Sequence, residues 1–424
     1  TQRDGVEARL RVALGRAEFV ATRNAEAVDQ LYRAAELAES GGDPAPLAEA
    51  ALVASLNRRH GRDDPELLRL LERASATCPP EPAVLPAMLH VRRSRLRPLT
   101  VRHEERSAMA RRALVDLDLM EPVDRATVET EVARACWCPD DADDRIAVTS
   151  RLVELADREL RVGGPSRWTG VLIEALNLRW AARVQVGDVR GALDDANRAA
   201  AVADEAGTSF LLSRVMMGQS MIHATLGNHE LAERLSHEAL ALSDRHNLVL
   251  VQMAITYSIG RDRGQQQQLS ELEEQLGDLV DSNPMFVAAF ALVHAEAGQH
   301  DDARRLLSAL TEQAPWPRNW LWLATTTAAL ETAVLVDDRQ LAERLTAVLT
   351  RYSGSWAMAA AELACWGPVD RVLGLAHVSA GRVERGRELI TAALDSASSQ
   401  HAEPWIERCT AGLESAAVAE VRSI

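Results

Sequence analysis

The stretch that decides the fold of this chain runs from Thr208 to Arg245 and reads TSFLLSRVMMGQSMIHATLGNHELAERLSHEALALSDR. Apolar positions recur at helical spacing on both sides of a short turn, Leu226–His229. Gly227 can adopt a positive φ and end the first helix there. The stripe before the turn comprises Leu212, Val215, Met216, Gln219, Ile222, His223 and Leu226, and the stripe after it comprises Ala232, Leu235, Ala239 and Leu242. One hairpin of two helices cannot bury both of its faces, so the sequence predicts neighbours of the same kind.

The same pattern recurs through the second half of the chain. Each turn residue precedes a small residue five positions later and an apolar residue twelve positions later. The turn residues are Gly187, Gly227, Gly298, Asp337 and Gly381; the small residues are Ala192, Ala232, Ala303, Ala342 and Gly386; the apolar residues are Ala199, Ala239, Leu310, Leu349 and Ala393. Successive turn residues lie 40, 71, 39 and 44 positions apart, which indicates a unit of roughly 40 residues with one double step. Since a tetratricopeptide unit is a helix–turn–helix of about 34 residues, we predict an all-α protein, an α-solenoid of tetratricopeptide-like helical hairpins with about 20 helices in a right-handed superhelix.

The first part of the chain carries helical stripes with less regular spacing. We expect helices over residues 101–117, 122–137 and 146–161, among others, and an acidic turn at Asp140–Asp144. Gly163-Gly164-Pro165 is the clearest interior break. The sequence therefore predicts irregular helical repeats over residues 1–162 and tetratricopeptide-like repeats over 163–424, continuous with the first part.

The composition of the chain excludes or disfavours several classes of function. The net charge is −15, which disfavours direct nucleic-acid binding, because phosphate contact needs a surplus of cations. The chain has no Lys, which excludes a P-loop and Schiff-base chemistry. It has no apolar run long enough to span a membrane, and its five scattered Cys favour a reducing cytoplasm. Since it begins at Thr1 without an initiator Met, we interpret it as a fragment or a processed chain.

Three motifs suggest chemistry but have simpler explanations. Cys136-Trp137-Cys138 lacks the second ligand pair that structural zinc needs, so packing at a helix end is favoured. Asp140–Asp144 lacks the Gly and distal Glu of a calcium loop. His223 is expected to be a core histidine bonded to a carbonyl. With no nucleophile, metalloprotease or dinucleotide motif present, we predict that the chain is not an enzyme and needs no cofactor and no metal.

Tryptophans gather near the C-terminal third, where five of the 9 Trp fall between Trp316 and Trp366. Two interpretations stay open. Large side chains could fill irregular hairpin junctions, which is the favoured reading. Alternatively, a groove could bind a ligand or partner. The residues of that candidate site are Trp316, Arg318, Asn319, Trp320, Trp366, Asp370 and Arg371.

Several segments resemble one family of proteins. They are Leu31–Ala38, Gly42-Asp43-Pro44 with Leu47–Leu52, Leu70–Ala74, Asn319-Trp320-Leu321, Cys365–Leu375 and Pro404-Trp405. With these segments the chain is similar to the C-terminal helical-repeat region of actinobacterial signalling ATPases, which include LuxR-type transcriptional regulators and adenylate-cyclase-like proteins. The resemblance implies a regulatory module that senses an inducer or partner and restrains a nucleotide-binding switch. This chain itself holds neither the P-loop nor a C-terminal helix-turn-helix.

Together these observations favour a non-catalytic sensor and protein-interaction module, which binds a ligand or partner on its concave face. Its expected partners are a protein, the parent's own ATPase or output domain, or a small-molecule inducer. The alternative is a structural solenoid for oligomerisation. An unrecognised enzyme that uses the region from His223 to His246 is the least favoured hypothesis.

Overall fold

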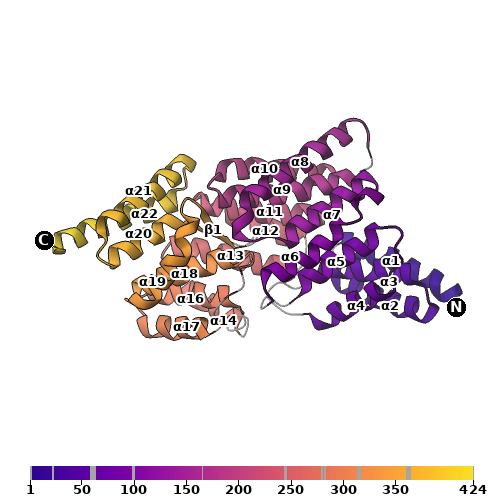
Figure 1. The fold of residues 1–424 in the computed structure, drawn as a ribbon, viewed down its shortest axis with the longest axis horizontal. Coiled ribbons are helices and arrows are strands. Elements are labelled where there is room, and N and C mark those ends of the chain that lie inside the picture. Colours follow the sequence, from indigo (N-terminus) through magenta and orange to yellow (C-terminus); the bar gives the residue numbers. More distant parts are fainter. Residues whose placement is uncertain are drawn as a thin grey trace.

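We describe the protein from a computed structural model, which covers residues 2–21, 23–57, 64–97, 101–164, 166–242, 246–277, 280, 283–312, 316, 318–359 and 364–423. These residues form 21 α-helices, five short 3₁₀ helices and one two-stranded sheet. Figure 1 shows helices packed side by side in an elongated molecule, with the two termini at opposite ends. The predicted all-α helical-repeat fold is confirmed.

The elements before the interior break at Gly163 are α1 (Gln2–Val20), α2 (Asn24–Gly41), α3 (Pro44–Ala54), η1 (Ser55–Asn57), α4 (Pro65–Thr77), α5 (Val84–Leu96), α6 (His103–Arg111), η2 (Arg112–Leu114), η3 (Leu117–Leu119), α7 (Pro122–Ala135), η4 (Pro139–Asp141) and α8 (Ala142–Arg161). Those after it are α9 (Arg167–Gln185), α10 (Val189–Glu205), α11 (Ser209–Thr225), α12 (His229–Leu242), α13 (His246–Asp262), α14 (Gln266–Leu276), α16 (Pro284–Glu296), α17 (His300–Glu312), α18 (Trp322–Leu335), α19 (Arg339–Leu349), η5 (Thr350–Tyr352), β1 (Trp356–Ala359), β2 (Ala364–Pro368), α20 (Val369–Ser379), α21 (Val383–Gln400) and α22 (Glu403–Ser423).

The turns of the repeat follow the sequence pattern. All five predicted turn residues adopt a positive φ, between 56° at Asp337 and 88° at Gly227. The residue after each turn donates its N–H to the carbonyl five positions earlier, as in Asn228 to His223 at 2.9 Å. This bond satisfies a carbonyl that the end of the helix would otherwise leave without a partner.

The small and apolar positions of the repeat lie where the two helices of each hairpin touch. All ten are buried, and Ala192, Ala232 and Ala239 have no exposed surface. A small side chain lets two helix backbones approach closely, which explains why the pattern recurs.

The double step between Gly227 and Gly298 contains a further unit. Gly264 has a φ of 65°, and Gln265 N donates to Gly260 O at 2.8 Å, as in the other turns. Five positions after this turn stands Leu269, which is large and buried. The small residue has moved to the partner helix, because a Cβ on Gly260 would lie 2.9 Å from Leu269 Cδ2.

Helix α11 is buried more widely than its apolar stripe predicts. Of that stripe, Val215 and Ile222 are buried, whereas Leu212, Met216, Gln219, His223 and Leu226 are half-buried. The adjacent face is buried more completely, through Ser213, Met217, Ser220, Met221 and Ala224. Helices on several sides cover α11, so polar and small residues also lie inside; Ser220 Oγ, for example, donates to Ala232 O at 2.6 Å.

The two-stranded sheet is an element that the sequence pattern did not predict. Strands β1 and β2 pair antiparallel, with Met358 opposite Cys365, and every residue in them is buried. The hairpin lies between α9, α11 and α13 of the middle repeats and α18, α20 and α21 of the C-terminal repeats. It fills the interior between these helices. The backbone of Gly367 lies directly on the Trp405 ring, where a Cβ would overlap ring atoms.

Ion pairs in which at least one side chain is buried connect helices of neighbouring hairpins. In the C-terminal part, Arg371 on α20 lies 2.6 Å from Glu331 on α18, and Arg261 on α13 lies 2.5 Å from Glu296 on α16. In the N-terminal part, Arg95 on α5 lies 2.7 Å from Glu131 on α7. A carboxylate that is removed from water keeps its charge only when such partners take the place of its hydration shell. These pairs therefore fix the position of one hairpin against the next.

Candidate functional site

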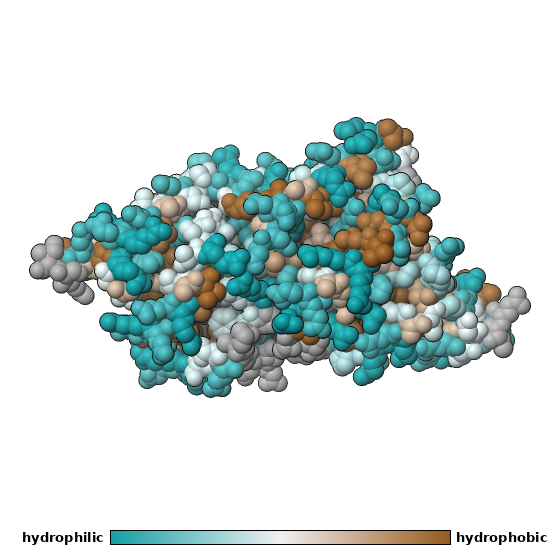
Figure 2. All heavy atoms as spheres, in the orientation of Figure 1, coloured by the Kyte–Doolittle hydropathy of each residue, from teal (hydrophilic) through white to brown (hydrophobic). Residues whose placement is uncertain are grey.

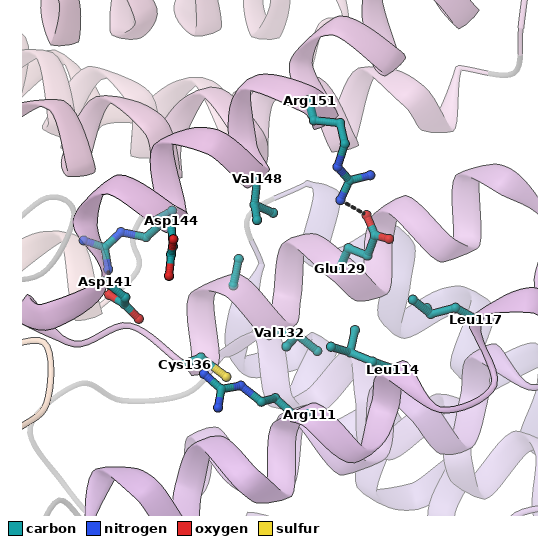
Figure 3. Close-up of a pocket in the computed structure, with 12 residues that line it drawn as sticks. Arg111, Leu114, Leu117, Glu129, Val132, Cys136, Asp141, Asp144, Val148 and Arg151 are labelled. Carbon is teal, nitrogen blue, oxygen red and sulfur yellow. Dashed lines mark hydrogen bonds and ion pairs between the residues drawn. The ribbon is translucent and has the colours of Figure 1, made fainter.

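The stacking of hairpins is interrupted between α6 and α8. The sequence predicted a continuous helix over residues 101–117, but α6 ends at Arg111 and the chain continues as the short turns η2 and η3. Helix α8 packs mainly on α9 and only lightly on α7. A cleft of about 270 Å³ therefore stays open between η2, α7 and the start of α8; we call it the α7–α8 cleft (Figure 3).

The α7–α8 cleft has an apolar part and a charged part. Leu114 and Leu117 come from the segment after α6, Val132 and Ala133 come from α7, and Val148 comes from α8. The other lining residues are Arg111, Glu129, Cys136, Asp141, Asp144, Arg145 and Arg151. Figure 3 shows the carboxylates of Asp141 and Asp144 on the α8 side, Arg111 on the opposite wall, and Leu114, Leu117 and Val132 toward the other end.

Two ion pairs fix the walls of the cleft. Arg151 Nη2 lies 2.8 Å from Glu129 Oε2 and joins α8 to α7. Arg145 lies 2.8 Å from Asp141, its guanidinium stacks on Trp137 at 4.6 Å, and it donates to Gln185 Oε1 at 2.8 Å. Because Arg145 is buried and held by all of these groups, it fixes the first turn of α8 against α9.

Cys136 lines the cleft as a free thiol. It is buried, and its Sγ donates to Ser107 O at 3.7 Å. Burial raises the pKa of this thiol, although nearby Arg111 opposes the shift. A thiol of raised pKa is a weak nucleophile, and no histidine stands among the described residues that line the cleft.

The turn before α8 is connected to the C-terminal part of the molecule. Asp140 accepts a hydrogen bond from Tyr352 Oη at 2.7 Å. The same carboxylate lies 2.9 Å from Arg351 Nη2 and 3.6 Å from Arg318 Nη1. This cluster joins η4 to η5 across more than two hundred residues, next to the wall of the cleft.

The residues of the sequence-predicted site do not form one open groove with the α7–α8 cleft. Asn319, Trp366, Asp370 and Arg371 are buried, and Trp316, Arg318 and Trp320 are half-buried. They divide into two groups around the hairpin, and their role in binding stays a prediction.

One group holds the segment before α18. Trp316 Nε1 donates to Leu310 O at 3.0 Å, Asn319 Oδ1 accepts from Leu321 N at 2.9 Å, and Arg318 stacks on Trp322 at 5.4 Å. Trp320 packs against two of the hydrophobic clusters.

The other group holds the end of the hairpin. Asp370 accepts from Gly354 N at 2.9 Å, and Arg371 pairs with Glu331. The Trp366 ring lies 5.9 Å from that of Tyr257.

Part of the cleft carries a signal in the sequence. Cys136 and the acidic run Asp140–Asp144 were singled out, and both border it. Arg111, Leu114 and Leu117 were assigned to a regular helix. A usable signal is the run Val115–Leu119, in which apolar and acidic residues alternate and break the helical spacing.

His223 lies near the surface of the repeat turn. It is half-buried, and its Nδ1 lies 3.5 Å from Asn228 Nδ2 rather than against a carbonyl. Burial lowers the pKa of its imidazole. Within the described residues, no three side chains of His, Cys, Asp or Glu converge as metal ligands. Across the same residues, no helix combines the length and apolar character that a membrane crossing requires.

The fold defines the class of the molecule as an α-helical-repeat protein built from tetratricopeptide-like hairpins. No protein-family model matches the chain, and no curated protein matches it. Among solved structures, a Rap protein complexed with Competence and Sporulation Factor is similar at 11% identity, with 97% of this chain and 99% of that chain covered and a TM-score of 0.42. Yeast Tom70 is similar at 11% identity, with 98% and 96% covered and a TM-score of 0.41. The tetratricopeptide domain of P58(IPK) is similar at 14% identity, with 98% and 99% covered and a TM-score of 0.27.

Proposed function

We propose that this chain is a non-catalytic regulatory module of a larger signal-transducing ATPase or transcriptional regulator, and that a protein partner binds it around the α7–α8 cleft. The observation that carries the proposal is the distribution of open surface. Between α9 and α20 the interior of the array is filled by the chain's own hairpin, whose nine strand residues are all buried. The cleft beside α7 is open, so we place the partner there rather than on the concave face.

The rim of the cleft has the character of an interaction surface. Val115 and Leu119 are each 77% exposed, and Leu114 is 36% exposed. Figure 2 shows apolar side chains gathered beside α7 on this face. Single exposed apolar residues are common, but several together beside a concave site favour a protein partner. A net charge of −15 favours a protein over a nucleic acid.

Attachment to a signalling ATPase is supported by the resemblance of Asn319–Leu321 and Cys365–Leu375 to the repeats of that family. Because this chain has no Lys, nucleotide hydrolysis would belong to another part of the parent protein. Sequencing the open reading frame around this chain tests the attachment. We expect a P-loop module in the same frame, whereas a frame with neither an ATPase nor an output domain would contradict it.

Titration calorimetry with the separately expressed ATPase module tests the surface. We expect a Kd of about 1–10 μM, weakened about tenfold or more by Val115→Glu with Leu119→Glu. The control is Val162→Glu, because Val162 is 76% exposed but lies just beyond the far end of α8. Equal binding by both variants would rule out the rim of the cleft as the site.

One observation favours self-association as a second function. Val6, Leu10 and Leu14 form a stripe on α1 and are 56%, 66% and 45% exposed, while its opposite face packs on α2 through Ala8 and Val12. Light scattering should then show a mass that rises with concentration and that Leu10→Glu abolishes. A constant monomer mass would exclude this function.

A further inference from the structure

Two opposite charges at the α7–α8 cleft lack a partner of opposite sign within the described part of the chain. The other charged groups of the wall are matched, Glu129 with Arg151 and Asp141 with Arg145. Asp144 and Arg111 take part in no ion pair there. Both side chains are exposed: Asp144 stands in the first turn of α8, and Arg111 stands at the end of α6 beside the Cys136 thiol.

The unmatched charges face the cleft from opposite walls. In Figure 3, Asp144 points into the cleft from α8, and Arg111 points toward it from below Cys136. A carboxylate can hold an ammonium group, and a guanidinium can bind a carboxylate with two parallel hydrogen bonds. The charged end of the cleft therefore offers one site for a cation and one for an anion.

The apolar end of the cleft sets a third requirement for a ligand. Leu114, Leu117, Val132 and Val148 line this end beside the Glu129–Arg151 ion pair, whose two charges are matched to each other. The volume of about 270 Å³ lies just below the range of small-molecule sites, roughly 300–1,000 Å³. A ligand that satisfies the whole cleft is small, carries both charges at one end and has an apolar group at the other.

We propose that the α7–α8 cleft binds a zwitterionic small molecule with an apolar side chain, and that a free α-amino acid such as leucine, methionine or phenylalanine is its ligand. Its ammonium group pairs with Asp144, its carboxylate pairs with Arg111, and its side chain packs against Leu114, Leu117 and Val148. An internal peptide segment has neither a free α-ammonium nor a free α-carboxylate, so its backbone leaves Asp144 and Arg111 unmatched. The inference rests on the proposed regulatory function and names the signal that the module senses.

Calorimetric titration of the full chain with L-leucine, L-methionine and L-phenylalanine tests the inference. We expect saturable binding with a Kd of about 1 mM or tighter for at least one of them. N-acetyl-L-leucine lacks the ammonium group and L-leucinamide lacks the carboxylate, so each should bind about tenfold or more weakly than L-leucine. Absence of binding by all three amino acids at about 10 mM, or equal binding of the capped forms, overturns the inference.

Matched variants locate the binding. Asp144→Asn and Arg111→Gln should each weaken binding about tenfold or more, because each removes one charged contact. Asp143→Asn and Arg112→Gln change neighbouring charges that do not line the cleft, so they should bind as the unchanged chain does. Circular dichroism confirms that each variant is folded. Unchanged affinity of a folded Asp144→Asn or Arg111→Gln variant overturns the inference.

The same preparations separate this inference from the proposed function. If the ATPase module binds through Val115 and Leu119 while no amino acid binds, only the zwitterion site is wrong. If an amino acid binds in the cleft while the ATPase module does not bind, the zwitterion site is supported and the proposed partner is wrong.

Discussion

The α6–α8 region and the β1–β2 region are both places where regular hairpin stacking stops, yet one is open and the other is closed. After α19 the chain places nine buried strand residues in the gap, with Trp356 and Trp366 among them. After α6 it offers the smaller side chains of Leu114 and Leu117, and a cleft of about 270 Å³ remains. An interruption of a repeat thus becomes core or site according to whether the chain supplies enough side-chain volume to fill it.

The ion pairs of the two regions also differ in how far they are exposed to water. Glu331 and Arg371 beside the hairpin have side chains only 6% and 4% exposed. Arg151 at the cleft pairs with Glu129 but is 57% exposed. Water can solvate the charges of the Glu129–Arg151 pair but cannot reach those of the Glu331–Arg371 pair. Substitutions should therefore lower the stability of the fold strongly in the closed region and only slightly in the open region.

The largest effect is expected at Trp356. Its ring is fully buried beside Trp405, and its Nε1 donates to Ser396 Oγ at 3.0 Å. Trp356→Ala should lower the free energy of unfolding by about 3–5 kcal/mol, measured by urea denaturation. Leu117→Ala at the cleft is the comparison, with a loss of about 1 kcal/mol or less. Similar losses at both positions would remove the contrast between the regions.

A smaller but still large effect is expected at Glu331. Glu331→Gln leaves the buried guanidinium of Arg371 without its carboxylate and should cost about 3 kcal/mol in urea denaturation. Glu129→Gln breaks the exposed pair at the cleft and should cost about 1 kcal/mol or less. If Glu331→Gln cost no more stability than Glu129→Gln, water would have access to the closed interior.

Acid should weaken the buried pairs of the array. Burial raises the pKa of Glu174, but Arg134 and Arg214 outweigh it and lower the pKa to about 2. Since this pKa lies below its ordinary value, the carboxylate stabilises the fold above about pH 4.5, and the contribution is lost as the pH falls toward 2. Denaturation curves of the unchanged chain and of Glu174→Gln should therefore converge over this range. A difference that stays constant with pH would contradict the assignment.

The smallest predicted loss concerns the contact between the two helices of a hairpin. Ala239 on α12 has no exposed surface, so Ala239→Leu should cost about 1–3 kcal/mol through overpacking. Ala241→Leu, on the exposed face of the same helix, should change stability by about 0.5 kcal/mol or less. Thermal unfolding of the pair measures the difference. A harmless Ala239→Leu would mean that this position does not control helix approach.

The repeat could be predicted because its determinants are local. A residue able to take positive φ, a small residue at five positions and an apolar one at twelve are readable from the sequence, and Gly227, Ala232 and Ala239 fulfil all three roles. The unit at Gly264 does not match the sequence pattern, because its small residue, Gly260, lies on the other helix of the pair. Such an exchange preserves packing but breaks the sequence pattern.

The hairpin and the cleft could not be predicted because both depend on distant residues. Trp356 and Trp366 are buried against α9, α13 and α22, none of which is adjacent to the hairpin in sequence. The end of α6 at Arg111 opens a cleft only because α8 turns toward α9. Asp140 illustrates the same limit, since its partners Tyr352 and Arg351 are visible only in the folded chain.

Hydrogen–deuterium exchange of the unmodified chain tests most directly whether the hairpin closes the interior while the cleft stays open. Amides of β1 and β2 should exchange about a hundredfold or more slowly than those of η2 and η3, because the hairpin is released only when the helices around it separate. Exchange of the hairpin as fast as that of η2 and η3 would show that the interior opens readily, and would contradict the assignment of the hairpin as core and of the α7–α8 cleft as the open site.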